Sequence, residues 1–399
     1  MPATSLPFPV YDADNHLYEP EEAFIRYLPK RFERDFYFVD VKGRRKLVLA
    51  GKLSEYIPNP TFEVVAAPGT HVRWFRADNP EGLTLREMTG KPIRPPETWR
   101  TGDGRIALLD EQGLHAALVF PTLASALEAH LDARAEATAA LFHSLNQWTV
   151  DEWGFARENR LFSVPFISLT DVARALQELD FVLDHGARTV NIRPAPVPDV
   201  RGSRSFGQPE YDPFWARVAD AGIFVCMHAS DSGYDRITQW WTGGEGNSEF
   251  LAFERSALQS TFDLLGRAIA DSMSALVCHG VFERHPRLRV VAVENGASWV
   301  GPLLGRLDRA YGQMPQAFKT HPRAQFERHV YVAPFYEDDM QALRRDVPVE
   351  RMLFGSDFPH PEGVAEPLEY LEEFEGFAPD EIEKIFGTNL RCLIEGRAT

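Results

Sequence analysis

The chain has 399 residues, of which 44% are hydrophobic, enough to build a large core. Its formal net charge of -16 argues against nucleic acid or an anionic membrane surface as a partner. Three cysteines, Cys226, Cys278 and Cys392, are too few and too scattered for a disulfide framework. The sequence shows no signal-peptide pattern and no apolar run of about 18 residues, so we expect a cytoplasmic protein with no membrane span.

The chain opens with a short apolar strand, predicted over residues 9–14, that runs into a polar stretch. Side chains alternate along a strand, so Asp12, Asp14 and His16 are expected to share one face. Three ionisable groups on one face are costly to bury unless a cation binds them. A divalent metal at the end of this strand is the natural candidate, and a solvated acidic loop is the alternative. A helix is predicted from about Glu21, with Glu19 at its start.

The next region, residues 36–101, is predicted to be an insertion wrapped on the body of the protein. Residues 36–52 alternate apolar and polar positions around a central Lys-Gly pair, which predicts a β-hairpin. Residues 53–101 are rich in Pro, Gly and Asn and show no clear period, and long irregular segments are often functional. The aromatic residues Trp74, Phe75 and Trp99 either line a substrate pocket or pack these loops onto the body.

Beyond residue 104, short apolar runs alternate with helical patterns. Seven further strands are predicted: Ala116–Phe120, Leu161–Ile167, Thr189–Ile192, Ile223–His228, Leu288–Glu294, His329–Val332 and Met352–Asp357. The clearest helical patterns are Leu131–Ala156, Asp171–Gly186, Tyr211–Gly222 and Glu254–Glu283, with a closing helix over residues 378–396. Eight strands alternating with helices predict an α/β fold, a (β/α)8 TIM barrel, as a single domain over residues 1–399. An open doubly wound sheet is the alternative, disfavoured because no Gly-rich phosphate loop follows the first strand.

Chemistry on such a barrel lies at the C-terminal ends of the strands. Four predicted strands end in residues that can bind a metal: Asp14 with His16, His228, Glu294 and Asp357. Four such ends in one barrel favour a metal site over coincidence. Three further residues are weaker candidates: His279 could equally be a core histidine, Glu19 an acid at a helix N-terminus, and His360 a residue that orients a ligand.

Several motifs together resemble the amidohydrolase-related branch of the amidohydrolase superfamily. They are Asp12-Ala13-Asp14-Asn15-His16, His228, the block at 280–289, and Gly355-Ser356-Asp357. The resemblance implies a metal-dependent decarboxylase or hydrolase on a (β/α)8 barrel, with Asp14, His16, His228 and Asp357 as metal ligands. The chain departs from the family twice. Asp14 stands where the family usually has His or Glu, and Glu294 stands where the branch's decarboxylases have a catalytic His. The strand at 189–192 also lacks the lysine that bridges two metals in the superfamily's binuclear hydrolases.

The carboxylate-rich set also resembles a small offshoot of this branch, the binuclear non-haem iron or iron/manganese monooxygenases. That resemblance implies two divalent metals, with iron favoured and manganese or zinc as alternatives. The ligands would be Asp14, His16, Glu19, His228, His279, Glu294 and Asp357, with catalytic roles for Glu294 and His279 and supporting roles for Asp12 and His360. The enzyme would use O2 and an electron donor to hydroxylate a bulky, mostly apolar small molecule such as a terpenoid.

The alternative is a mononuclear metal-dependent hydrolase or decarboxylase that acts on a small carboxylate or amide. In that case one metal would activate water or polarise the substrate, and Glu294 would act as a general base. The sequence leaves a homo-oligomer open.

Overall fold

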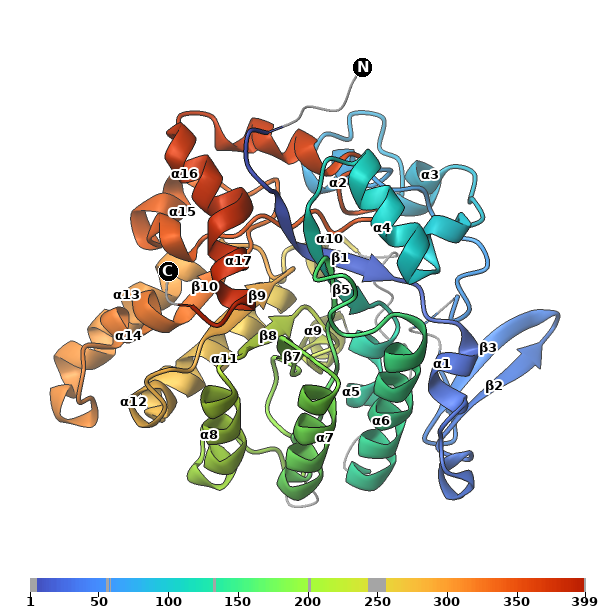
Figure 1. Ribbon diagram of the computed structural model, residues 1–399, viewed down its shortest axis with the longest axis horizontal. Coiled ribbons are helices and arrows are strands. Elements are labelled where there is room, and N and C mark those ends of the chain that lie inside the picture. The colour runs from blue at the N-terminus through green and yellow to red at the C-terminus, as the bar shows by residue number, and fades with distance from the viewer. Residues whose placement is uncertain are drawn as a thin grey trace.

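The strands form two parallel sheets and one small antiparallel sheet in the computed structural model, which describes residues 6–54, 57, 59–131, 134–199, 202–242 and 256–397. The first parallel sheet has the order β1-β5-β6, formed by β1 (Tyr11–Leu17), β5 (Ala116–Pro121) and β6 (Leu161–Ser163). The second has the order β10-β9-β8-β7, formed by β7 (Thr189–Asn191), β8 (Phe224–His228), β9 (Val290–Val293) and β10 (Val330–Val332). Helices surround these strands in Figure 1.

The two parallel sheets are joined at both edges by isolated bridges. One junction joins β6 to β7. The other joins β10 to β1 through the extended segment 352–358. Three parallel bridges make these connections: Phe166 with Asn191, Val332 with Met352, and Asn15 with Phe358. The parallel order and these connections are consistent with the predicted TIM barrel. The predicted eighth strand, Met352–Asp357, is therefore an extended segment with bridges and hydrogen bonds rather than a regular strand.

Helices alternate with the parallel strands. Those that follow β5 to β10 are α5 (Glu128–Leu131), α6 (Ala135–Glu152), α7 (Val172–Asp184), α8 (Asp212–Ala221), α9 (Asp235–Thr242), α10 (Ala257–Ser260), α11 (Leu264–Cys278), α12 (Val281–Arg284), α13 (Val300–Gln313), α14 (Pro322–His329) and α15 (Met340–Asp346). The single helix predicted over 254–283 is three helices, α10, α11 and α12, and its first two residues lie outside the described residues. Asp171 caps α7 by accepting from the backbone N–H of Ala173 and Arg174, as expected at a helix N-terminus.

The predicted hairpin is confirmed. Strands β2 (Phe36–Val41) and β3 (Arg44–Leu49) pair antiparallel, and β4 (Lys52–Leu53) extends the small sheet. The hairpin projects beside helix α1 (Glu21–Ile25) in Figure 1. The rest of the 36–101 region holds α2 (Val72–Phe75), α3 (Leu85–Thr89) and the 3-10 turn η2 (Glu97–Trp99), and α4 (Gly102–Glu111) follows it. That this region is an insertion stays a prediction.

The C-terminal segment packs against the first strand. It consists of α16 (Pro379–Glu383), a π-helical turn, η8 (Lys384–Thr388), and α17 (Asn389–Ile394), in place of the one predicted helix. The remaining 3-10 segments are η1 (Lys30–Phe32), η3 (Ala124–Ala126), η4 (Pro209–Tyr211), η5 (Pro315–Ala317), η6 (Val349–Arg351) and η7 (Pro367–Phe374).

The core follows from the apolar strands. Every residue of β8 and β9 is buried, which is typical of parallel strands covered on both faces. All seven residues of β1 are buried as well, although this strand carries two aspartates, an asparagine and a histidine. Polar groups buried at that depth need partners. In the described part of the chain, no helix has the length and apolar character needed to cross a membrane.

Candidate metal centre

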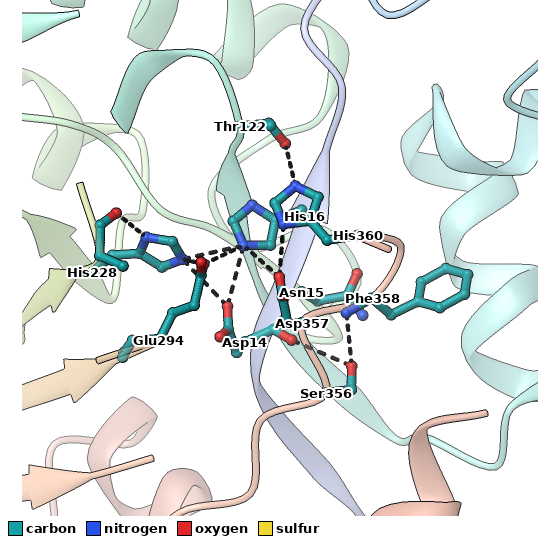
Figure 2. A network of polar contacts seen from close by, with 12 residues as sticks. Asp14, Asn15, His16, Thr122, His228, Glu294, Ser356, Asp357, Phe358 and His360 are labelled. Carbon is teal, nitrogen blue, oxygen red and sulfur yellow. Dashed lines mark hydrogen bonds and ion pairs between the residues drawn. The ribbon is translucent and has the colours of Figure 1, made fainter. Parts of the chain in front are cut away.

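The side chains that end the strands meet at one edge of the sheets. β1 contributes Asp14 and His16, β8 contributes His228, Glu294 follows β9, and Asp357 lies in the segment next to β1 (Figure 2). Parallel strands present their carboxyl ends on the same side, which explains why residues so distant in sequence converge. Glu294 and Asp357 both have a φ of 55°, in the left-handed region that non-glycine residues rarely adopt and that clusters at functional sites.

The converging atoms are two imidazole nitrogens and three carboxylate oxygens. His228 Nε2 lies 2.8 Å from Glu294 Oε2 and 3.4 Å from Asp14 Oδ1. His16 Nε2 lies 3.3 Å from Asp14 Oδ1, 3.4 Å from Glu294 Oε2 and 3.3 Å from Asp357 Oδ1. The two Nε2 atoms are 3.1 Å apart. Among the described residues, two overlapping groups could hold an ion: Asp14, His16, His228 and Glu294, and His16, Glu294, Asp357 and His360.

These residues fit a divalent metal. Asp14 Oδ1, Glu294 Oε2 and Asp357 Oδ1 are buried oxygens without a hydrogen-bond partner, which is costly for carboxylates unless a cation binds them. A mixed set of imidazole and carboxylate ligands suits zinc, manganese or iron. The three described cysteines are absent from both groups, so nothing here favours a soft, thiolate-preferring metal.

His228 is oriented as metal-binding histidines are. Its Nδ1–H donates to the carbonyl oxygen of Ala229 at 2.8 Å, which leaves Nε2 free to face the centre. Its backbone N–H donates to Asn191 Oδ1 at 3.0 Å, so a buried asparagine on β7 fixes the end of β8. Burial opposes a charge on His228, but Glu294 and Asp14 raise its pKa to about 10. The centre therefore attracts positive charge, which a metal ion would supply.

The carboxyls of Glu294 and Asp357, which both lie near His16 Nε2, have different proton affinities. Burial acts to raise the pKa of Glu294, but the neighbouring His228 and His16 outweigh it and lower that pKa well below its ordinary value. Burial, together with the charges of Glu294 and Asp14, raises the pKa of Asp357 well above its ordinary value. Such a divergence distinguishes a carboxylate that stays ionised from a carboxyl that can carry a proton.

Asp12 ties β1 to the segment that carries Asp357. Its Oδ1 accepts from the backbone N–H groups of Asp14 at 3.0 Å and Ser356 at 2.9 Å. Its Oδ2 accepts from Asn15 Nδ2 at 3.2 Å and from Ser356 Oγ at 2.6 Å. Asp12 is fully buried, and burial raises its pKa to about 6. Its side chain thus contacts the backbone beside Asp14 and Asp357, and a supporting role for Asp12 stays a prediction.

His360 lies directly against the centre. Its Nδ1 is 2.7 Å from Asp357 Oδ1, and its Nε2 is 3.0 Å from Thr122 Oγ1. Its ring stacks on the ring of His16 with the centroids 3.9 Å apart (Figure 2). Burial and the proximity of His16 lower its pKa well below the ordinary value. The lowered pKa favours a neutral imidazole beside the carboxyl of Asp357.

Two predicted ligands, Glu19 and His279, lie elsewhere, so their assignment to the metal is corrected. Both carboxylate oxygens of Glu19 accept from backbone N–H groups of residues 122–124, at 3.0 to 3.1 Å, so this acid anchors the loop after β5. His279 is exposed at the C-terminal end of α11. Neither belongs to the groups of described residues that could hold an ion. The sequence alone did not reveal the direction of either side chain.

Arg105 is a supporting residue that the sequence did not reveal. It is fully buried, and its Nη1 donates to the carbonyl oxygen of His16 at 2.8 Å and to Asn15 Oδ1. Its Nη2 donates to the carbonyl oxygen of Trp99 at 3.2 Å. Burial lowers the pKa of Arg105 to about 10. The sequence of α4 shows only one arginine among apolar and acidic residues, and nothing there distinguishes it from a surface arginine.

Two cavities open beside the metal centre. The larger, of about 460 Å³, includes Asp14, Glu294 and Asp357 in its wall, and the other, of about 400 Å³, includes His16, His228 and Glu294. Both share Glu294, so they meet at the centre.

The aromatic residues of the 36–101 region do not all line the two cavities. Phe75 lines both cavities. Trp99 is buried with Tyr18 and Phe358, so it packs the loops onto the body. Trp74 borders a separate surface hollow. Trp240 and Trp241, on α9, are 78% and 71% exposed.

Comparison with known proteins decides the family. The amidohydrolase family model matches residues 12–391. The chain belongs to this family. Among solved structures, an amidohydrolase from Mycobacterium avium subsp. paratuberculosis K-10 is 39% identical with a TM-score of 0.91, and the match covers 98% of this chain and 100% of that one. No curated protein matches.

More distant structures share the fold of this amidohydrolase. A dihydroxybenzoic acid decarboxylase from Polaromonas sp. JS666, with bound manganese, is 18% identical with a TM-score of 0.58 and covers 84% of this chain and 96% of its own. A 5-carboxyvanillate decarboxylase from Novosphingobium aromaticivorans DSM 12444, also with manganese, is 14% identical with a TM-score of 0.59 and covers 98% and 99%. The expectation of an iron monooxygenase finds no support in these relatives.

Proposed function

We propose that this amidohydrolase is a metal-dependent decarboxylase of a small carboxylic acid, built on a (β/α)8 barrel. The observation that carries the proposal is the convergence of Asp14, His16, His228 and Glu294 on one point. The distant relatives with this fold include decarboxylases with bound manganese, which favours the same class of reaction and metal. The substrate would be a small organic acid that fits the two cavities.

In this proposal the four residues of the first group hold one divalent metal, manganese being favoured. When bound, the metal supplies positive charge that binds and polarises the substrate's carboxylate. The low pKa of Glu294 suits a ligand better than the general base expected from the sequence. His228 and His16 present their Nε2 atoms to the same point, and Asp14 supplies the second carboxylate.

Asp357 and His360 are left for proton transfer. As the bond between the substrate carbon and its carboxylate breaks, CO2 leaves and the electron pair remains on the carbon. That carbon then takes a proton from the carboxyl of Asp357, whose raised pKa lets it carry one. Each turnover consumes one proton, and water entering the two cavities that Asp357 and His360 line would return it to Asp357.

The proposal is tested by incubating the manganese-loaded protein with a panel of hydroxylated and aminated benzoic acids. The quantity measured is the CO2 released from each acid. In D2O the product should carry one deuterium at the carbon that lost the carboxylate. We expect Asp357→Asn to keep its manganese and to lose more than about a hundredfold in turnover, because general acid catalysis contributes 10²–10⁴-fold. Hydrolysis of amides or esters without CO2 release would refute decarboxylation.

One observation favours a second candidate, the binuclear iron or iron/manganese monooxygenase. The second group of potential ligands, His16, Glu294, Asp357 and His360, overlaps the first, and carboxylates can bridge two ions. This candidate requires O2 and an electron donor, and it expects two metal ions per chain. Metal content together with substrate-dependent O2 consumption separates it from the decarboxylase.

A further inference from the structure

The 400 Å³ cavity combines residues of the metal centre at one place in its wall with apolar residues over much of the rest. The residues of the centre are His16, His228, Glu294 and His360. Six apolar residues of the 36–101 region also line it: Ile57, Phe62, Val65, Ala66, Phe75 and Leu85. A mostly apolar pocket with a few polar groups at one place is typical of a small-molecule site. The 36–101 region therefore builds the part of the wall that would contact the non-reacting part of a substrate.

Four aromatic rings in this wall form a continuous row. The ring of His360 stacks on that of His16, with the centroids 3.9 Å apart (Figure 2). The Tyr18 ring lies 5.9 Å from that of His360, and the Phe62 ring stacks on Tyr18 at 4.8 Å. All four residues line the cavity. Aromatic rings attract one another at centroid distances of about 4.5–7 Å, so a row that starts at the metal centre suits a flat aromatic ligand.

Phe62, the last ring of this row, has an unusual backbone conformation. Its φ of 48° lies in the left-handed region, which a bulky residue rarely adopts. Its carbonyl oxygen accepts from Arg100 Nη2 at 2.6 Å, which helps to hold the peptide in this orientation. Strained conformations of this kind persist where the surrounding structure holds them, and they cluster at ligand-binding sites. The strain is an observation separate from the apolar wall, and it too indicates that Phe62 contacts a ligand.

The same wall offers no cation to a second charged group on a substrate. Among the described residues that line this cavity, none is a lysine or an arginine. Asp231 and Glu362 are acids, and Asp231 is paired with His130 at 3.2 Å. Burial lowers the pKa of His71, whose Nε2 lies 2.8 Å from Thr89 Oγ1, and so favours its neutral form. A carboxylate placed away from the metal would be buried without a cation, which is costly.

The size of the cavity indicates how large the ligand can be. An apolar cavity of about 150 Å³ holds one benzene ring. The 400 Å³ present here leaves room for a second ring beside the one that carries the reacting carboxylate. We infer that the substrate is a flat two-ring aromatic acid with a single carboxylate, and that Phe62 selects it by stacking on the second ring. The inference rests on the proposed function in one respect, because it assumes that the carboxylate binds at the metal centre.

Three acids test this inference by calorimetric titration of the manganese-loaded protein: benzoate, 2-naphthoate and naphthalene-2,6-dicarboxylate. We expect 2-naphthoate to bind at least about tenfold more tightly than benzoate, because its second ring is removed from water. Naphthalene-2,6-dicarboxylate has the same rings with a second charge, and it should bind at least about tenfold more weakly than 2-naphthoate.

The role of Phe62 is tested with Phe62→Leu, which keeps an apolar side chain and removes the ring. The ratio of 2-naphthoate to benzoate affinity should fall about three- to tenfold, because the stacking contact is lost. Phe318→Leu is the matched control, since Phe318 is half-buried and lines neither cavity, and it should leave the ratio unchanged.

The inference would be overturned if 2-naphthoate did not bind, or bound no more tightly than benzoate, whatever the variants do. Equal affinity for the mono- and dicarboxylate, or an unchanged ratio in Phe62→Leu, would also overturn it. The proposed function is measured separately, by CO2 release. Selective binding of 2-naphthoate without CO2 release from any acid supports this inference and refutes the decarboxylase, whereas decarboxylation without preference for the second ring does the reverse.

Discussion

Asp12 is expected to stabilise the metal centre although it does not face the metal. Its carboxylate accepts four hydrogen bonds, two of them from the backbone N–H groups of Asp14 and Ser356. Asp12→Ala leaves those two buried donors without an acceptor. Each unsatisfied buried donor costs about 1–3 kcal/mol, and local relaxation recovers part of this, so we expect a loss of about 3 kcal/mol in the free energy of unfolding.

Urea unfolding of the metal-free protein measures this loss, because the metal's own contribution is then absent. Asp12→Asn is the control, since its amide oxygen can still accept from Asp14 and Ser356 while its Nδ2 opposes the donor of Asn15. It should lose about 1 kcal/mol. Asp12→Ala should also bind manganese more weakly, because the backbone of the ligand Asp14 loses its hydrogen bond to Asp12. A loss below about 1 kcal/mol with unchanged manganese binding would refute the reasoning.

Three further predictions follow from individual contacts. A Cβ at Gly355 would lie 2.7 Å from Asp14 Cβ, so Gly355→Ala should reduce manganese occupancy by metal analysis while far-ultraviolet circular dichroism stays native. The hydrogen bond to Glu178 raises the pKa of His143, so the pair stabilises the fold below about pH 6.5 and this stabilisation is lost as the pH rises through the folded pKa. His143→Gln should therefore show a smaller fall in urea midpoint between about pH 6 and pH 9 than the unmodified protein. Chelation should lower the thermal midpoint, because a metal at a hundred times its dissociation constant contributes about 2.7 kcal/mol, and an unchanged midpoint would contradict a bound metal.

The ligands at the strand ends could be predicted because the rule behind them is local. His228 and Glu294 each follow an unbroken apolar run, and such runs in an alternating pattern indicate parallel strands whose ends meet. Asp14 and His16 stand two residues apart and their side chains meet, although the register of β1 against β5 shifts between Asp12 and Asn15. No tertiary information was needed to bring these residues together.

The supporting contacts could not be predicted because they join residues distant in sequence. Glu19 resembles its neighbouring acids in the sequence, but its partners are backbone N–H groups about a hundred residues away. Arg105 contacts the backbone of β1, and nothing in α4 indicates that it is buried. Asn191 supports His228 only because β7 lies beside β8.

The acidic wall of the larger cavity beside the metal centre could not be predicted for a related reason. Its acids come from separate loops after β8, β9 and β10 and from the loop around Glu362, and each acid alone is an ordinary surface residue in the sequence. The net charge of -16 indicated an acidic protein but not where the charge gathers. Only the fold brings these groups to one wall beside the metal centre.

Metal stoichiometry in the purified and manganese-loaded protein tests the central claim most directly, with Glu294→Gln measured beside it. The account predicts one equivalent of divalent metal per chain, lost or strongly reduced in Glu294→Gln, because this residue contributes a ligand oxygen 2.8 Å from His228 Nε2. Protein that binds no metal, or a Glu294→Gln variant that binds it as well as the unmodified chain, would contradict the account. Two equivalents of iron with O2 consumption would support the monooxygenase in place of the decarboxylase.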